Sequence, residues 1–346
     1  MTSPWTEFLV GEGAVIEDHT VTFPNESAGA TKTIAVPLLD LGLIRSSGDD
    51  SAAFLHNLCS NDVKKLAAGD VQWNSFNSPK GRMLASFLLW PQDDGHCLAV
   101  SADLHPAFLK KLSMYVLRSK VRLSDAGAEL ALVGLSGANA RELIERANLP
   151  CPDAPMKQAI RDGSRTLRLT SEAFIVAVPV AQAGTTFRAL LDAGAQRAGT
   201  SAWQLAMIRA GLPMITVATQ EEFVAQMVNF DLIGGVSFTK GCYPGQEIVA
   251  RTRYLGKLKK RMYRVSARDT ALPKAGTDLY TPGFGDQSAG KIVNAAPTPD
   301  GGFEALAVLQ ISCAQTGPAF LGAPDGPQLE LLDLPYELSD AEAEHS

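Results

Sequence analysis

Apolar residues along the first two thirds of the chain alternate between strand-like and helix-like spacing. A strand is predicted over Ile34–Ile44, followed by a helix that places Phe54, Leu55 and Leu58 on one face. Further strands are predicted at Val71–Phe76, Met83–Trp90, His96–Ser101, Leu130–Leu135, Leu167–Thr170 and Phe174–Val180. Further helices are predicted at His105–Ser119, Asn139–Ala147, Thr186–Ala195 and Trp203–Ala210. Strands and helices that alternate in this way predict an α+β fold built in layers.

The pattern changes after Met262. Short alternating runs are separated there by turns rich in proline and glycine, which predicts a small β-barrel or sandwich. The expected organisation is a loose N-terminal arm over 1–36, an α+β region over 37–255 with subdomains at about 37–125 and 126–255, a C-terminal β-barrel over 258–338 and an acidic tail over 339–346.

Composition narrows the class of protein. The 346 residues are 46% hydrophobic and 20% charged, as in a globular protein with two or three subdomains. A net charge of −6 argues against a general nucleic-acid binder. No apolar run reaches the roughly 18–20 residues of a membrane helix, and the first residues lack the pattern of a secretion signal. A cytoplasmic location is therefore expected.

The five cysteines are far apart in the sequence and form no Cys-x-x-Cys pair. This spacing is typical of reduced cytosolic thiols and predicts no local zinc or cluster site, so no metal ligands are assigned. An iron–sulfur cluster usually takes four thiolates, so any cluster chemistry would need ligands from a partner.

One of these thiols has a distinctive setting. Cys242 follows Gly241 and precedes Pro244-Gly245, and a helix is predicted over Gln246–Leu255. A cysteine just before a helix N-terminus and two residues from Lys240 favours the thiolate form. The alternative is that Cys242 is a small buried hydrophobic residue, as free cysteines often are.

The sequence Lys240-Gly241-Cys242-Tyr243, followed by Gly245-Gln246-Glu247, resembles the signature Lys-Gly-Cys-aromatic-x-Gly-Gln-Glu of the YgfZ family. The family comprises folate-binding proteins linked to iron–sulfur cluster maintenance and tRNA modification, and its members are paralogues of the glycine-cleavage T-protein. The resemblance extends to Pro79–Arg82, to Gly211–Pro213 and to Leu334–Tyr336. It implies a T-protein-like multi-subdomain ring with a C-terminal β-barrel.

The same resemblance implies tetrahydrofolate, or another folate, as the cofactor. The implied partners are iron–sulfur assembly proteins or client enzymes, including enzymes that modify tRNA, and direct contact with tRNA is possible. No membrane partner is expected.

The resemblance also suggests which residues act. Cys242 is the implied reactive thiol, with Lys240 and Glu247 beside it. The implied folate contacts are Trp203, Gln226, Asn229, Arg209, Gln246 and Tyr243. A ring such as Trp203 can stack on a pterin, amides can pair with its edge, and arginines, Arg82 included, can hold the glutamate tail.

Each of these assignments has a structural alternative. Trp203 is equally typical of a helix core, the two amides can cap the neighbouring helix, and the arginines can be ordinary surface ion-pair partners. Two positions depart from the family. Ala225 stands where a proline is common, and Leu41 lies near a position where some members use a second tryptophan for folate contact.

The T-protein's catalytic aspartate has no counterpart here, because alignment on Gly81 puts Ala85-Ser86 in its place. Cys242 in turn stands where the T-protein has an acidic residue. A site without that carboxylate lacks a general acid–base group for aminomethyl transfer. A classical aminomethyltransferase is therefore not expected. The alternatives are a folate-dependent aminomethyltransferase or demethylase, and a non-catalytic interaction scaffold.

The most basic stretch of the chain comprises Arg251, Arg253, Lys257, Lys259, Lys260 and Arg261. It is interpreted as a solvated helix face. The alternative is a landing site for RNA, for polyglutamate or for an acidic partner.

Overall fold

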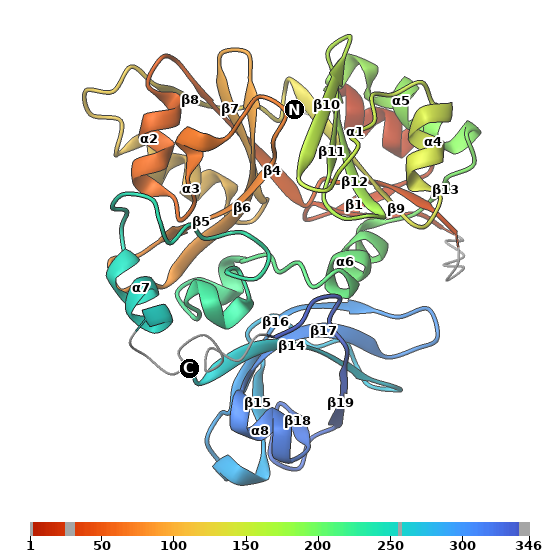
Figure 1. Cartoon of the computed structure of the whole chain (residues 1–346). Coiled ribbons are helices and arrows are strands. Elements are labelled where there is room, and N and C mark those ends of the chain that lie inside the picture. Colours follow the sequence, from red (N-terminus) through yellow and green to blue (C-terminus); the bar gives the residue numbers. More distant parts are fainter. Residues whose placement is uncertain (1–2, 25–31, 255–257, 339–346) are drawn as a thin grey trace. The chain divides into compact units, whose positions relative to one another are not determined.

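The computed structural model describes residues 3–24, 32–254 and 258–338 (Figure 1). Two compact units make up the chain. The first comprises Met1–Phe54, Lys64–Gln72 and Phe87–Ala206, and the second comprises Leu55–Val63, Trp73–Ser86 and Met207–Ser346. The predicted subdomain boundaries stay a prediction.

A six-stranded sheet with strand order β10-β11-β12-β9-β3-β13 forms the centre of the first unit. Its strands are β3 (Ile34–Pro37), β9 (Leu130–Ser136), β10 (Lys157–Arg161), β11 (Ser164–Arg168), β12 (Ala173–Pro179) and β13 (Gln196–Arg197). The pairs are antiparallel except β13 with β3. Strands β9 and β12 are buried along most of their length, which explains their nearly continuous apolar sequences.

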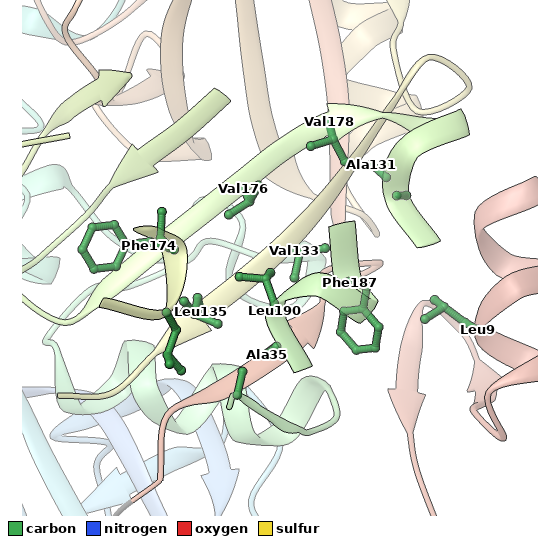
Figure 2. Close-up of a cluster of buried hydrophobic side chains, with 14 of the residues drawn as sticks. Leu9, Ala35, Ala131, Val133, Leu135, Phe174, Val176, Val178, Phe187 and Leu190 are labelled. Carbon is green, nitrogen blue, oxygen red and sulfur yellow. The ribbon is translucent and has the colours of Figure 1, made fainter. Parts of the chain in front are cut away.

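Helices cover one face of this sheet. They are α1 (Pro4–Gly11), α4 (Ala140–Arg146) and α5 (Val180–Asp192), and a small hairpin is formed by β1 (Val15–Glu17) and β2 (Thr20–Thr22). Figure 2 shows the core between them, where Phe187 and Leu190 of α5 lie near Val133 and Val176 of the sheet. On β9, Gly134 makes room for Trp203, since a Cβ there would lie 2.6 Å from the indole ring.

The N-terminal segment is not the loose arm that the sequence predicted. Ser3 caps α1 by accepting a hydrogen bond from the amide of Thr6, and Pro4 occupies the first helical turn. Trp5 and Leu9 are buried in the sheet core, and the Trp5 ring meets Phe187 edge to face with centroids 5.8 Å apart. Serine at the N-cap followed by proline is a known signal for a helix start, so this helix could have been predicted from the sequence.

A second sheet has the order β5-β6-β7-β4-β8. Its strands are β4 (Leu41–Ser47), β5 (Gln72–Asn77), β6 (Met83–Gln92), β7 (Gly95–Ser101) and β8 (Arg122–Asp125), and its helices are α2 (Ser51–Leu58), the short η1 (Val63–Lys65) and α3 (His105–Ser113). The single strand predicted over Ile34–Ile44 was wrong: β3 and β4 belong to different sheets. Pro37, which has no amide hydrogen to donate, ends the first of them.

Helix α3 ends at Ser113, six residues earlier than predicted. Beyond it Met114 and Leu117 are 64% and 85% exposed. The apolar spacing that suggested a longer helix therefore does not mark a buried face.

The second unit contains the cysteine motif and the barrel. The end of α6 (Thr200–Arg209) leads through the short helices η2 (Val217–Thr219) and η3 (Ala225–Val228) to α7 (Gln246–Tyr254). Helix α7 matches its predicted start, and Leu255 and Lys257 lie outside the described residues.

The closed C-terminal barrel confirms the prediction. Its order is β14-β17-β16-β15-β18-β19. The elements are β14 (Lys260–Ala267), β15 (Asp278–Tyr280), η4 (Pro282–Phe284), β16 (Gly290–Pro297), β17 (Phe303–Gln310), α8 (Ile311–Thr316), β18 (Ala319–Leu321) and β19 (Gln328–Leu332). Alternate residues Phe303, Ala305, Ala307 and Leu309 of β17 fill its interior. The predicted acidic tail over 339–346 lies outside the described residues.

Candidate functional site

The candidate site centres on the loop before α7. Cys242 is exposed there, whereas Tyr243 directly after it is buried. The helix begins at Gln246, four residues after the thiol, as the sequence predicted. The side chain of Cys242 therefore faces solvent, and the side chains of neighbouring residues hold the loop in place.

Lys240 is the first anchor. Its ammonium donates hydrogen bonds to the backbone carbonyls of His56, in the last turn of α2, and of Cys59, at 2.5 Å in the second case. The same nitrogen lies 4.8 Å from the centroid of the Tyr243 ring. A cation at a helix C-terminus is stabilised by the exposed carbonyls and the helix dipole. Lys240 therefore fixes the cysteine loop to the end of α2.

Gln246 is the second anchor. Its side-chain Oε1 accepts a hydrogen bond from the amide of Tyr243 at 3.3 Å. Burial of Tyr243 raises the pKa of its phenol to about 12. In these contacts both residues act on the protein itself, and their predicted folate contacts stay predictions.

Gly245 allows the loop to approach the 78–81 turn closely. Its φ is +78°, and a Cβ would lie 2.4 Å from the carbonyl oxygen of Ser78 and 2.7 Å from the Cα of Gly81. Only glycine tolerates both the conformation and the contact. The match of two sequence blocks, Pro79–Arg82 and the cysteine motif, thus has a physical counterpart in this packing.

The remaining cysteines differ from Cys242. Cys59, Cys97 and Cys313 are buried, and Cys151 is half-buried. Burial raises the pKa of the Cys59 and Cys97 thiols to about 12, and it also raises that of Cys151. At neutral pH the Cys59 and Cys97 thiols are therefore protonated and shielded, and Cys242 is the exposed cysteine of the described chain.

Gln226 lies in η3 and is 2% exposed. Its Nε2 donates to the carbonyl of Val249 in α7 at 2.6 Å, and its own backbone carbonyl accepts from the guanidinium of Arg261 at 2.8 Å. Its side-chain Oε1 is buried and has no hydrogen-bond partner in the described protein. One atom of this predicted folate residue is therefore free to accept a bond.

Asn229 and Arg209 serve the fold in the contacts observed. The side chain of Asn229 pairs with the backbone of Met262 in β14, donating at 2.9 Å. Arg209, at the end of α6, donates to Glu304 of the barrel at 2.7 and 3.0 Å. Their predicted folate contacts stay predictions.

The other predicted residues fall in different surroundings. Trp203, which belongs to the first unit, is 4% exposed and packs against Gly134. Glu247 is exposed in the first turn of α7. Arg82 donates to the carbonyl of Glu222 at 2.5 Å.

The sequence reasoning missed a group of buried polar side chains at the end of β5. Asn77 is 1% exposed and both of its amide atoms lack a hydrogen-bond partner in the described protein, as do the hydroxyls of Ser75 and Ser78. Buried polar atoms are normally paired. The available signal was a strand, Gln72–Asn77, that carries polar residues on both faces.

Backbone pairing relates these groups to Gln226. The amide of Ser78 donates to the carbonyl of Arg82 at 2.8 Å, and Arg82 forms an isolated bridge with Val224. Val224 directly precedes η3, which carries Gln226. Backbone pairing thus links the turn after β5 to the residue before η3.

The replacement of the T-protein's aspartate by Ala85-Ser86 stays a prediction. Ser86 is fully buried, and its hydroxyl accepts from the amide of Ile215 at 2.8 Å. A neutral, engaged hydroxyl is a poor general acid or base.

No helix among the described residues is both long and apolar enough to cross a bilayer. In the same part of the chain, no three His, Cys, Asp or Glu side chains gather in a way that could hold a metal ion.

Comparison with known proteins places the chain. Residues 32–157 match the GCVT N-terminal domain. The tRNA-modifying protein YgfZ of Enterobacter sp. (strain 638) is 30% identical over 324 residues, which cover 92% of this chain and 98% of that protein. The protein of the same name from Klebsiella pneumoniae (strain 342) is 30% identical over 322 residues, covering 92% and 97%.

The fold agrees with these matches. The crystal structure of the glycine cleavage system aminomethyltransferase T from Bartonella henselae superimposes with a TM-score of 0.79 over 97% of both chains, at 16% identity. This confirms the predicted T-protein-like α+β fold. The near full-length similarity to the two relatives confirms the family inferred from the cysteine motif: the chain belongs to the YgfZ family.

Proposed function

We propose that this protein binds a folate and supports the assembly or repair of iron–sulfur enzymes, including enzymes that modify tRNA, with Cys242 as its reactive group. The observation that carries the proposal is the contrast at the motif. Cys242 is exposed, while Lys240, Tyr243 and Gln246 around it are engaged in holding the loop. A loop held so firmly presents its thiol in a defined position.

The unpaired buried atoms fit a folate. A pterin ring carries donors and acceptors along one edge, and a buried amide that lacks partners can supply both. Asn77 offers Oδ1 and Nδ2, and Gln226 offers Oε1. We assign these two amides to the pterin edge. Gln226 also donates to Val249, so its Oε1 is already oriented by the protein.

The thiol supplies the chemistry in this proposal. A thiolate is a strong nucleophile and a ligand for iron, and a single one can take part in cluster handling only together with ligands from a partner. The partners are accordingly iron–sulfur assembly proteins or their client enzymes. Aminomethyl transfer is the less favoured reaction, because Ala85 and the engaged hydroxyl of Ser86 stand where a carboxylate would be needed.

Titration of the purified protein with tetrahydrofolate, followed by calorimetry, tests the folate assignment. Asn77→Leu is the sharpest variant, because the leucine has a similar volume and removes two buried polar atoms that lack partners. We expect unchanged or higher stability, together with about tenfold weaker folate binding from one lost hydrogen bond to the ligand.

Gln220→Ala is the matched control, since this exposed glutamine donates only to the carbonyl of Leu84. Its folate affinity should equal that of the wild type. Absence of folate binding by the wild-type protein would contradict the folate proposal. Equal binding by Asn77→Leu would remove Asn77 from the site.

A further inference from the structure

The exposed side of α7 carries a cluster of aromatic and cationic side chains. The guanidinium carbon of Arg253 lies 4.4 Å from the centroid of the Phe238 ring and 6.0 Å from that of Tyr254. The two rings meet edge to face, with centroids 6.4 Å apart at an interplanar angle of 80°. Tyr254 is 53% exposed. We call Phe238, Arg251, Arg253 and Tyr254 the α7 aromatic face.

Lys260 and Arg261, at the end of the basic stretch, are half-buried and buried. Arg261 is buried and paired with Asp231 at 2.7 and 3.0 Å. Lys260 is half-buried, and burial together with nearby Arg82 and Lys291 lowers its pKa. These two residues are therefore less accessible to a ligand than the exposed cations of the stretch.

Among the described residues of the stretch, three cations are exposed to solvent: Arg251, Arg253 and Lys259. The only acidic residue of α7 is Glu247 in its first turn. This face therefore carries local positive charge on a protein of net charge −6.

We propose that the α7 aromatic face is a contact surface for single-stranded RNA, an inference that rests on the proposed role in tRNA modification and names its nucleic-acid partner. Exposed rings and guanidinium planes offer stacking platforms for unpaired bases, and exposed cations pair with the phosphates. The guanidinium of Arg253 already lies over the Phe238 ring. An acidic peptide or a polyglutamate tail would use the cations alone and would leave the exposed Tyr254 ring without a role.

The face also flanks the thiol along the chain. Phe238 precedes Cys242 by four residues, and α7 begins four residues after it (Figure 1). RNA bound there would contact the segments on both sides of the cysteine loop. The surface is thus continuous in sequence with the proposed reactive group.

Fluorescence anisotropy with a fluorescein-labelled oligouridine of about ten nucleotides tests the inference. We expect binding by the full-length protein at low salt. Tyr254→Ala should weaken it about tenfold, and Tyr254→Phe should retain it, because the ring rather than the hydroxyl makes the stack. Arg251→Ala should lower the salt dependence by about 0.7 in the logarithmic slope, as expected for one lost phosphate contact.

A matched control comes from another exposed stretch that combines aromatic and basic residues. Tyr115 is 42% exposed, and Lys110 and Arg118 near it are exposed as well. Tyr115→Ala and the pair Lys110→Ala, Arg118→Ala should leave RNA affinity unchanged. A loss in these variants equal to that in the α7 variants would overturn the inference in favour of unspecific charge attraction.

Two other results would also overturn it: no binding at low salt, and binding that is insensitive to Tyr254→Ala. If the α7 variants bind RNA normally but fail to support an iron–sulfur enzyme, the face docks a protein and not RNA. Tetrahydrofolate titration of the same variants separates this inference from the proposed function. Normal folate binding without RNA binding would contradict only the RNA assignment. RNA binding without folate binding would contradict only the folate assignment.

Discussion

Cys59 and Cys242 lie in the same unit, and Lys240, two residues before Cys242, contacts the backbone of Cys59. The surroundings of the two thiols are nevertheless opposite. Cys59 is fully buried and bridges to Phe76, and its carbonyl accepts a hydrogen bond from Lys240. Cys242, two residues after that lysine, is exposed. Desolvation raises the pKa of the Cys59 thiol to about 12, although Lys240 acts to lower it. The difference teaches that burial, rather than a nearby cation, decides which of the two thiols can react.

Alkylation rates should separate these cysteines most strongly. With a pKa of about 12, only about one Cys59 thiol in ten thousand is ionised at pH 8, and the side chain is shielded as well. We expect iodoacetamide to modify Cys242 at least about a hundred times faster than Cys59 or Cys97, as read by mass spectrometry after short pulses. Half-buried Cys151 should fall between them.

Similar rates for Cys59 and Cys242 in the folded protein would break the comparison. In urea all five cysteines should react alike, which serves as the control.

Replacing Lys240 tests the link between the two regions. Lys240→Met removes two hydrogen bonds from an ammonium to carbonyls and one contact with an aromatic ring. The free energy of unfolding should fall by about 2–3 kcal/mol, measured by urea denaturation. Lys240→Arg should recover part of the loss.

Lys259→Met, at an exposed position, is the control and should change stability by less than about 0.5 kcal/mol. A loss no greater in Lys240→Met than in this control would show that Lys240 does not hold the loop.

The pH dependence of stability should sharpen the comparison further. Cys59 titrates near 9 in the unfolded chain and near 12 in the folded protein. Between these values the unfolded chain has lost the proton that the folded protein retains. The contribution of the protonated Cys59 thiol to the free energy of unfolding is thus fully present below about pH 9. It is lost as the pH rises towards 12, by at most about 1.4 kcal/mol per pH unit and per thiol.

Cys59→Ala should flatten the decline in the free energy of unfolding above pH 9. An unchanged decline in this variant would contradict the assigned burial.

Most of the fold could be predicted from the sequence, but two helices were not predicted correctly. The cysteine motif led to the family and hence to the T-protein-like fold, and alternation of short apolar runs predicted the barrel. The N-terminal helix was not predicted because its apolar periodicity is weak, and only the Ser-Pro start marks it. Helix α3 was predicted too long because its apolar spacing continues beyond Ser113. In that segment Leu117 is exposed, so the spacing does not reflect burial.

The site was less accessible from sequence. That Lys240 reaches the end of α2, nearly two hundred positions earlier in the chain, depends on tertiary packing that local spacing does not encode. Asn77 was overlooked for the same reason, since only the structure reveals that its amide is buried without partners. The motif indicated which residues matter, and the fold revealed what each one contacts.

The proposed role of Cys242 is tested most directly in cells that lack their own relative of this protein. The measurement is the ability of Cys242→Ala to support an iron–sulfur enzyme that modifies tRNA, with the modified nucleoside read by mass spectrometry. We predict a yield no higher than in cells without the protein, at normal abundance of the variant, while Cys59→Ala retains function. A full yield with Cys242→Ala would contradict the account and leave the cysteine loop a structural role alone.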